Sequence, residues 1–151
     1  MEVIHHELVN SSLSVVDTQD AITKIGQMLL SQDFVKDTFI NAVLEREKEF
    51  PTGLNLKNTS VAMPHTDSIH VNKPAICVVR LDEPVSFIHM GSTDVHVEAK
   101  MIFMMAISDP ETQLETLRKM MGVFHNVKAI DEFLEAKNNE VLYQIAKKYL
   151  G

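Results

Sequence analysis

The sequence predicts an α/β protein, specifically a three-layer α/β/α sandwich with a mixed central β-sheet. Strand-like segments gather in the middle of the chain, between residues 61 and 107, and helical patterns flank them on both sides. The run Met101-Ile102-Phe103-Met104-Met105-Ala106 is apolar at every position, which is typical of a strand covered on both faces. A sheet with helices before and after it in the sequence, and with both faces covered, favours a layered sandwich.

The N-terminal third predicts one short strand and two helices. The strand is expected around residues 13–16. Apolar residues then recur at helical spacing behind Asp17, which can cap a first turn, so residues 18–30 predict a helix. Asp33 can cap a second helix, whose pattern continues until Phe50-Pro51, because a residue before proline is forced out of the helical region.

Four strand candidates follow, and turn residues separate them. They span residues 61–63, 75–81, 85–88 and 95–107. Pro74, Asp82-Glu83-Pro84 and Gly91-Ser92 mark the turns between them.

The C-terminal third predicts three helices. Asp109-Pro110 is a strong helix start, since a carboxylate can cap the first turn and proline is favoured at the first helical position. The buried stripe of this helix is expected to consist of Leu114, Leu117, Met121 and Phe124. Two shorter helices are expected at residues 127–136 and 140–150.

Length, charge and cysteine content restrict the class of protein. A chain of 151 residues fits one domain, residues 1–151, without a disulfide or metal staple. The net charge of −7 argues against nucleic acid as a partner, because phosphate-backbone binders carry a basic face. The single Cys77 lies in an apolar run, which fits a buried, inert thiol in a reducing compartment. We therefore expect a cytoplasmic protein with no membrane-spanning segment.

The segment Ala62-Met63-Pro64-His65-Thr66 carries the strongest functional signal. A strand-like run ends at a proline, which places His65 in the loop behind it. A neutral imidazole can act as a nucleophile, a base or a ligand near neutral pH. The alternative is a histidine in an ordinary turn, but its position at the end of a strand favours a functional group.

Arg46 and the pair His65 and His70 each allow more than one interpretation. Arg46, in the last turns of the second helix, is either a solvated cation or a phosphate ligand, for which a planar guanidinium is well suited. His65 and His70, with Asp67 between them, also suggest a metal site, but their spacing matches no common metal-binding pattern. We expect no metal, and we expect the remaining histidines to be structural or on the surface.

Several motifs are spread along nearly the whole chain: Arg46-Glu47, Phe50-Pro51-Thr52-Gly53-Leu54, Val61-Ala62-Met63-Pro64-His65-Thr66, Phe87, Met90-Gly91, Asp109-Pro110, Gln113-Leu114 and Leu117. Together they resemble a known family, the fructose/mannitol-type enzyme IIA of the bacterial phosphoenolpyruvate-dependent sugar phosphotransferase system. Within the family, the resemblance is greatest to the galactitol-specific branch.

The resemblance implies a phosphocarrier in sugar transport that needs no cofactor. His65 would accept a phosphoryl group from the phosphohistidine of the small carrier HPr and pass it to a cysteine of an enzyme IIB. The sugar itself would be handled by the membrane enzyme IIC, so IIC is an indirect partner. Arg46 would stabilise the phosphate. These residue types suit in-line transfer, which requires alignment and neutralisation of charge more than covalent chemistry.

Two departures from the family pattern concern the same site. Many members have a second histidine at the start of the helix after the long apolar strand, where this chain has Gln113; an amide can donate a hydrogen bond to phosphate but cannot carry charge. A glycine often follows the phosphorylated histidine, where this chain has Thr66-Asp67. We expect the Thr66 hydroxyl to lie near the phosphate and the Asp67 carboxylate to turn away from it.

Alternative functions have the same residues around His65. A regulatory IIA-like protein would keep its phosphate and change its binding to a partner, whereas a transport component would pass the phosphate to IIB. A metal-binding or plain scaffold module is a third possibility. Galactitol as the transported compound rests on the resemblance alone.

Overall fold

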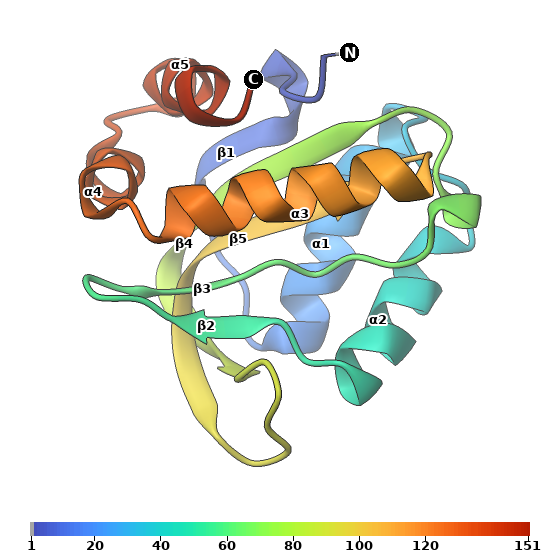
Figure 1. Ribbon diagram of the computed structural model, residues 1–151, viewed down its shortest axis with the longest axis horizontal. Helices are drawn as coiled ribbons and strands as arrows, with labels where there is room; N and C mark the ends of the chain where they lie inside the picture. The colour runs from blue at the N-terminus through green and yellow to red at the C-terminus, as the bar shows by residue number, and fades with distance from the viewer. Residues whose placement is uncertain (1) are drawn as a thin grey trace.

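The computed structural model describes residues 2–151, and its centre is a mixed five-stranded sheet with the strand order β1-β4-β5-β3-β2 (Figure 1). The β1–β4 and β3–β5 pairs are parallel, and the β4–β5 and β2–β3 pairs are antiparallel. The strands are β1 (Val9–Leu13), β2 (Gly53–Asn55), β3 (Ser60–Ala62), β4 (Ala75–Ile88) and β5 (His96–Ala106).

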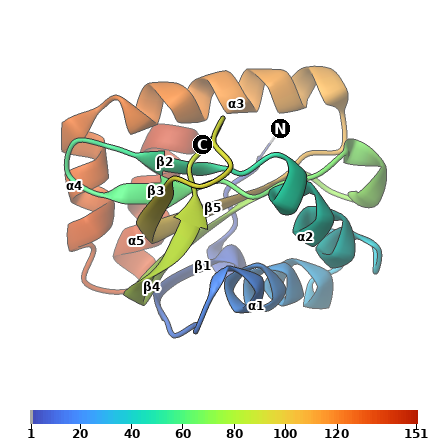
Figure 2. The same ribbon diagram turned by 90° about the horizontal axis from the view of Figure 1, so that it is seen from below.

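Helices cover both faces of the sheet, which confirms the predicted three-layer α/β/α sandwich (Figure 2). Helices α1 (Thr18–Ser31) and α2 (Phe39–Glu49) pack on one face. Helices α3 (Pro110–Phe124), α4 (Val127–Glu135) and α5 (Asn139–Leu150) pack on the other. Two short 3₁₀ helices, η1 (His6–Leu8) and η2 (Ser68–His70), lie in the connections. No helix within residues 2–151 has the length and apolar character needed to cross a membrane.

The long strand β5 separates two hydrophobic cores, as its sequence predicts. Ile102 and Met104 face α1 and α2, whereas Phe103 and Met105 face α3, α4 and α5. All four side chains are fully buried. The Phe103 ring lies 5.3 Å, centroid to centroid, from both Phe124 and Phe133. Period-two alternation on a doubly covered strand thus supplies both cores at once.

The helix starts predicted from capping residues are confirmed where the cap is a local contact. The Asp17 side chain accepts a hydrogen bond from the Asp20 backbone N–H at the start of α1, and Asp109 accepts one from Thr112 at the start of α3. Asn126 and Asn138 cap α4 and α5 in the same way.

Two predictions in the N-terminal third are wrong. The first strand is Val9–Leu13, ahead of the expected residues 13–16, because Val9 pairs with Val78 of β4. The second helix begins at Phe39 and is not capped by Asp33, which adopts a positive φ of 64° just after α1. An aspartate tolerates that conformation better than most residues, and here it ends one helix instead of starting the next.

Three further differences concern the sheet and α3. The predicted break at residues 82–84 is absent, because β4 continues to Ile88 with only an irregular register between Arg80 and Val85. The strand β2 was not predicted, because three residues are too few to show the alternation of apolar and polar side chains that indicates a strand. Leu114, expected in the buried stripe of α3, is 51% exposed, and Met120 is buried instead.

The sheet topology brings two loops together. Strands β3 and β5 are parallel, so the loop after β3 and the loop after β5 leave the same edge of the sheet. The first contains His65 and the second leads through Asp109 into α3. The carboxyl ends of parallel strands are where open α/β sheets bind ligands. We therefore expect a functional site at this edge of the sheet.

Candidate active site

His65 lies in the loop directly after β3, and the neighbouring strand fixes this loop. The Met105 backbone N–H of β5 donates a hydrogen bond of 3.1 Å to the Pro64 carbonyl, which continues the strand pairing past the end of β3. The His65 side chain is partly buried, and its Nδ1 lies 2.9 Å from the Met63 carbonyl oxygen. Since a carbonyl can only accept, Nδ1 carries the proton. The lone pair therefore lies on Nε2.

The surroundings of His65 keep the ring neutral. Burial lowers the pKa of His65 from its ordinary value, and the positive charge of Arg46 lowers it further. The hydrogen bond to Met63 and the negative charge of Asp67 act in the opposite direction, but the net effect is a lowered pKa. A neutral ring with its Nδ1 proton held by a carbonyl is a nucleophile at Nε2.

Arg46 stands at the end of α2 beside the His65 loop. Its guanidinium nitrogen lies 3.8 Å from an Asp67 carboxylate oxygen, and its Cζ lies 5.1 Å from the centroid of the Phe50 ring. The Arg46 side chain is 37% exposed, so solvent reaches part of it. This arrangement can receive an anion from solvent.

Asp67 does not turn away from the site, contrary to the expectation from the sequence. Its side chain is exposed, but the carboxylate faces Arg46 and its charge reaches the His65 ring. The reason is electrostatic, because the Arg46 guanidinium attracts the carboxylate. In this structure Asp67 is thus the anion that accompanies Arg46.

Gln113 lies in the first turn of α3 and contacts the same loop. Its side-chain nitrogen donates a hydrogen bond of 2.9 Å to the Thr66 carbonyl oxygen. Because that partner is an acceptor, the orientation of the amide is fixed, and its second N–H proton stays free for another acceptor. The structure therefore brings Gln113 to the residue next to His65. Thr66 itself is buried, and its carbonyl oxygen, not its hydroxyl, makes this contact.

Sequence reasoning assigned no role to Glu47, although it is buried beside the site. Only 8% of it is exposed, and its two carboxylate oxygens accept hydrogen bonds from the backbone N–H and the hydroxyl of Thr52, each 2.8 Å long. Burial raises the pKa of Glu47 to about 7, and the two bonds from Thr52 oppose this shift. The sequence offered one signal for this contact: Glu47 is a charged residue that directly follows Arg46 and precedes Thr52 by five positions.

The other residues singled out in the sequence lie elsewhere. The ring of His70 makes a hydrogen bond of 2.8 Å with the Thr38 hydroxyl, so it helps to anchor η2 to the loop before α2. Cys77 is fully buried in β4, where burial raises the pKa of its thiol. Within residues 2–151 there is no group of three or more histidine, cysteine or acidic side chains arranged to hold a metal ion.

Comparison with known proteins points to one family. The family model for the phosphoenolpyruvate-dependent sugar phosphotransferase system, EIIA 2, matches residues 2–149. The galactitol-specific EIIA component of the phosphotransferase system of Escherichia coli strain K12 is 34% identical over 114 residues, which cover 76% of this chain and 75% of that protein.

Two solved structures share the fold. A complex of the mannitol enzyme IIA with phosphorylated enzyme IIB from Escherichia coli matches with a TM-score of 0.73 and 18% identity, covering 94% of this chain and 95% of that one. The nitrogen regulatory protein IIA-Ntr from Neisseria meningitidis matches with a TM-score of 0.75 and 20% identity, covering 95% of each chain. The full-length family match and the galactitol relative together show that this chain belongs to the EIIA 2 family of the sugar phosphotransferase system, whose members are phosphotransferases that carry a phosphohistidine.

Proposed function

We propose that this chain is a single enzyme IIA domain that accepts a phosphoryl group from phosphorylated HPr on Nε2 of His65 and passes it to a cysteine of an enzyme IIB. The observation that supports this assignment most directly is the bond of 2.9 Å between His65 Nδ1 and the Met63 carbonyl. It leaves the Nε2 lone pair available and fixes the plane of the ring. A nucleophile that is aligned before the donor arrives needs little further reorganisation.

The transfer step exchanges one phosphorus–nitrogen bond for another. The Nε2 lone pair of His65 attacks the phosphorus while the bond to the HPr histidine breaks, and that electron pair stays on the departing ring nitrogen. The proton stays on His65 Nδ1 throughout, where it is hydrogen-bonded to the Met63 carbonyl oxygen. Arg46 neutralises charge on the phosphoryl oxygens, as expected for transfer dominated by positioning and electrostatics. In the step toward IIB, a cysteine thiolate attacks the phosphorus and forms a phosphorus–sulfur bond, while the bond to His65 Nε2 breaks and its electron pair returns to that nitrogen.

The transported compound is proposed to be galactitol, because the relative with 34% identity is a galactitol-specific EIIA component. The carrier would work in the cytoplasm, where phosphoenolpyruvate enters the pathway through enzyme I and HPr, and the membrane enzyme IIC would be its indirect partner. The test is to incubate the protein with phosphoenolpyruvate, enzyme I and HPr, and to locate acid-labile phosphate by mass spectrometry. Phosphate on His65 that moves to a galactitol-type IIB supports the proposal, and an unlabelled protein overturns it.

A regulatory role is the second candidate, because the IIA-Ntr protein shares this fold. The destination of the phosphate separates the two. A regulator keeps its label in the presence of IIB, and its affinity for a binding partner changes with phosphorylation. Transfer to the IIB cysteine within the mixing time of a rapid-quench experiment would exclude retention as the main outcome.

Gln113→Ala is expected to slow transfer from phosphorylated HPr by about tenfold to a hundredfold. The substitution removes the bond to the Thr66 carbonyl and the free N–H of the amide. A neutral hydrogen bond is worth roughly 0.5 to 1.5 kcal/mol and one to a charged group about 1.5 to 3, and each 1.36 kcal/mol is tenfold in rate. Single-turnover kinetics measure the effect. An unchanged rate would mean that the first turn of α3 does not act on the phosphoryl group.

Cys77→Ser is expected to be labelled and to pass phosphate on like the wild type. The thiol is fully buried in the middle of β4, where it pairs with Met104, and its raised pKa keeps it protonated. Labelling is measured by mass spectrometry on protein whose circular dichroism spectrum is native. Loss of label from a folded variant would contradict an inert Cys77.

A further inference from the structure

The Glu47 carboxylate joins two parts of the chain that meet at the active site. Both of its oxygens accept hydrogen bonds from Thr52, one from the backbone N–H and one from the hydroxyl, and both bonds are 2.8 Å long. Glu47 belongs to the last turns of α2, and Thr52 directly precedes β2. Two hydrogen bonds to one buried carboxyl group hold that side chain in a fixed place. The end of α2 is therefore fastened to the start of β2.

A series of backbone contacts continues from Thr52 to His65. The Met63 N–H lies 3.4 Å from the Thr52 carbonyl oxygen, and Gly53 pairs with Ala62 across the β2–β3 strands. The Met63 carbonyl in turn accepts the bond from His65 Nδ1. The position of the imidazole thus depends on the strand pair that Glu47 holds against α2.

On the helix side, Glu47 directly follows Arg46. Successive residues of an α-helix point about 100° apart, so the two side chains can face different neighbours. Arg46 faces Asp67, and Glu47 faces Thr52. The last α-helical bond runs from the Phe50 N–H to the Arg46 carbonyl, and the helix ends there because Pro51 follows. Only four residues link Glu47 to Thr52, so a bond between these two fixes the direction of the last helical turn.

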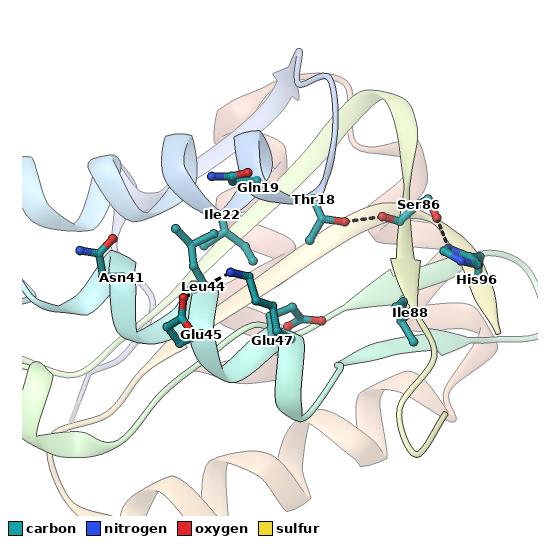
Figure 3. A pocket seen from close by; sticks show the side chains of 11 residues that line it. Thr18, Gln19, Ile22, Asn41, Leu44, Glu45, Glu47, Ser86, Ile88 and His96 are labelled. Atoms are coloured by element: carbon teal, nitrogen blue, oxygen red, sulfur yellow. Dashed lines mark hydrogen bonds and ion pairs between the residues drawn. The ribbon is translucent and has the colours of Figure 1, made fainter. Parts of the chain in front are cut away.

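The location of this carboxylate is unfavourable for its charge. Burial raises the pKa of Glu47 to about 7, so its charged form is disfavoured here. Glu47 also borders a cleft of about 450 Å³ between α1, α2 and the β4–β5 pair, which is lined mostly by polar residues together with Ile22, Leu44 and Ile88 (Figure 3). An apolar side chain at position 47 would avoid the free-energy cost of taking a carboxylate out of water. It could not accept two hydrogen bonds from Thr52. The carboxylate therefore orients the chain at a cost in solvation.

We propose that Glu47 is a positioning residue for phosphoryl transfer, which sets the place of the Arg46 guanidinium relative to Nε2 of His65. The inference rests on the proposed function, because it concerns the rate at which His65 takes up phosphate. Glu47 does not touch the phosphoryl group. It acts through Thr52 on the His65 strand pair and through α2 on Arg46.

Three variants of one helical turn test the proposal. Glu47→Ala removes both bonds to Thr52 and is expected to slow single-turnover transfer from phosphorylated HPr by about tenfold to a hundredfold. Glu47→Gln keeps both contacts, since its amide oxygen can accept from the Thr52 N–H and its amide nitrogen can donate to the hydroxyl, and it should stay within about threefold of the wild type. Glu45→Gln is the matched control on the exposed side of α2, and no change is expected there.

A double-mutant cycle with Arg46→Ala separates positioning from a general loss of structure. If Glu47 acts mainly through the guanidinium, Glu47→Ala slows the Arg46→Ala protein by no more than about threefold, because only its effect on the His65 strand pair remains. The same slowing in both backgrounds would overturn the proposal. Urea unfolding curves measured at the assay temperature check that every variant is folded there.

Thr52→Val covers the case in which Glu47→Ala fails to fold. It removes the hydroxyl bond and keeps the backbone bond, so it should slow transfer severalfold in the wild-type background and have a smaller effect after Arg46→Ala. Nitrogen NMR of the His65 ring adds a second readout. The Nδ1-protonated form should dominate in the wild type and lose population in Glu47→Ala, and an unchanged ring together with an unchanged rate would contradict the inference.

The outcomes also separate this inference from the proposed function. A wild-type protein that takes no phosphate from HPr overturns both. A wild-type protein that is labelled on His65, together with an additive cycle between Arg46 and Glu47, overturns only the role given to Glu47.

Discussion

Replacing His65 with alanine is expected to abolish labelling by phosphoenolpyruvate, enzyme I and HPr while leaving the fold intact. The substitution removes the nitrogen that would carry the phosphoryl group, and no other imidazole shares its contacts with Met63, Arg46 and Asp67 within residues 2–151. The side chain is only partly buried and makes one hydrogen bond to the protein, which is worth roughly 0.5 to 1.5 kcal/mol. Mass spectrometry and urea unfolding measure the two expectations.

His70→Ala is the matched control for this experiment. His70 lies five positions further on, and its ring makes a hydrogen bond with the Thr38 hydroxyl. This variant should be labelled to the same extent as the wild type. Phosphate that persists on the His65→Ala protein would show that the acceptor is another residue.

Arg46→Ala is expected to slow transfer from phosphorylated HPr by about a hundredfold or more. A guanidinium can hold two phosphoryl oxygens at once, and hydrogen bonds between charged groups are worth about 1.5 to 3 kcal/mol each. Arg46→Lys should be slowed less, because an ammonium keeps the charge but loses the fork. Stability should remain near native, since the ion pair with Asp67 is exposed and such pairs contribute about 0 to 1 kcal/mol.

Lys48→Ala provides the control for a general loss of positive charge. Lys48 is a cation two residues later on α2, mostly exposed and paired with Glu45. Its removal lowers the local charge by the same amount but should leave transfer within about threefold of the wild type, because exposed charges at longer range are screened. Equal rates for Arg46→Ala and the wild type would remove Arg46 from the site.

The parts of the fold that sequence reasoning located are those with local causes. The carboxylate of Asp109 caps its own helix, and the apolar run in β5 reports burial on both faces directly. His65 was located in the same way, since the end of a strand and the proline before it are neighbours in sequence. Each of these features depends on residues within a few positions of one another.

The parts that it missed depend on contacts between distant segments. Val9 pairs with Val78, so the position of β1 is decided by β4. The strand β4 passes through Pro84 because Val85 pairs with Ala99 beyond the irregular register. The role of Glu47 is visible only when Thr52 stands opposite its carboxylate, and no periodic pattern records such a pair. Asp67 likewise was expected to turn away because its negative charge would repel a phosphate, and its partner Arg46 lies 21 positions earlier in the chain.

The ion pair between Arg46 and Asp67 bears on how firmly a phosphoryl group would be kept. Without phosphate, Asp67 supplies the anion beside the guanidinium. In the proposed cycle the phosphoryl oxygens must share that cation with a carboxylate of like charge, which raises the free energy of the phosphorylated state. A carrier benefits from such competition, because a product held too tightly is never delivered. Asp67 would thereby raise the group-transfer potential of the phosphohistidine and favour onward delivery over storage.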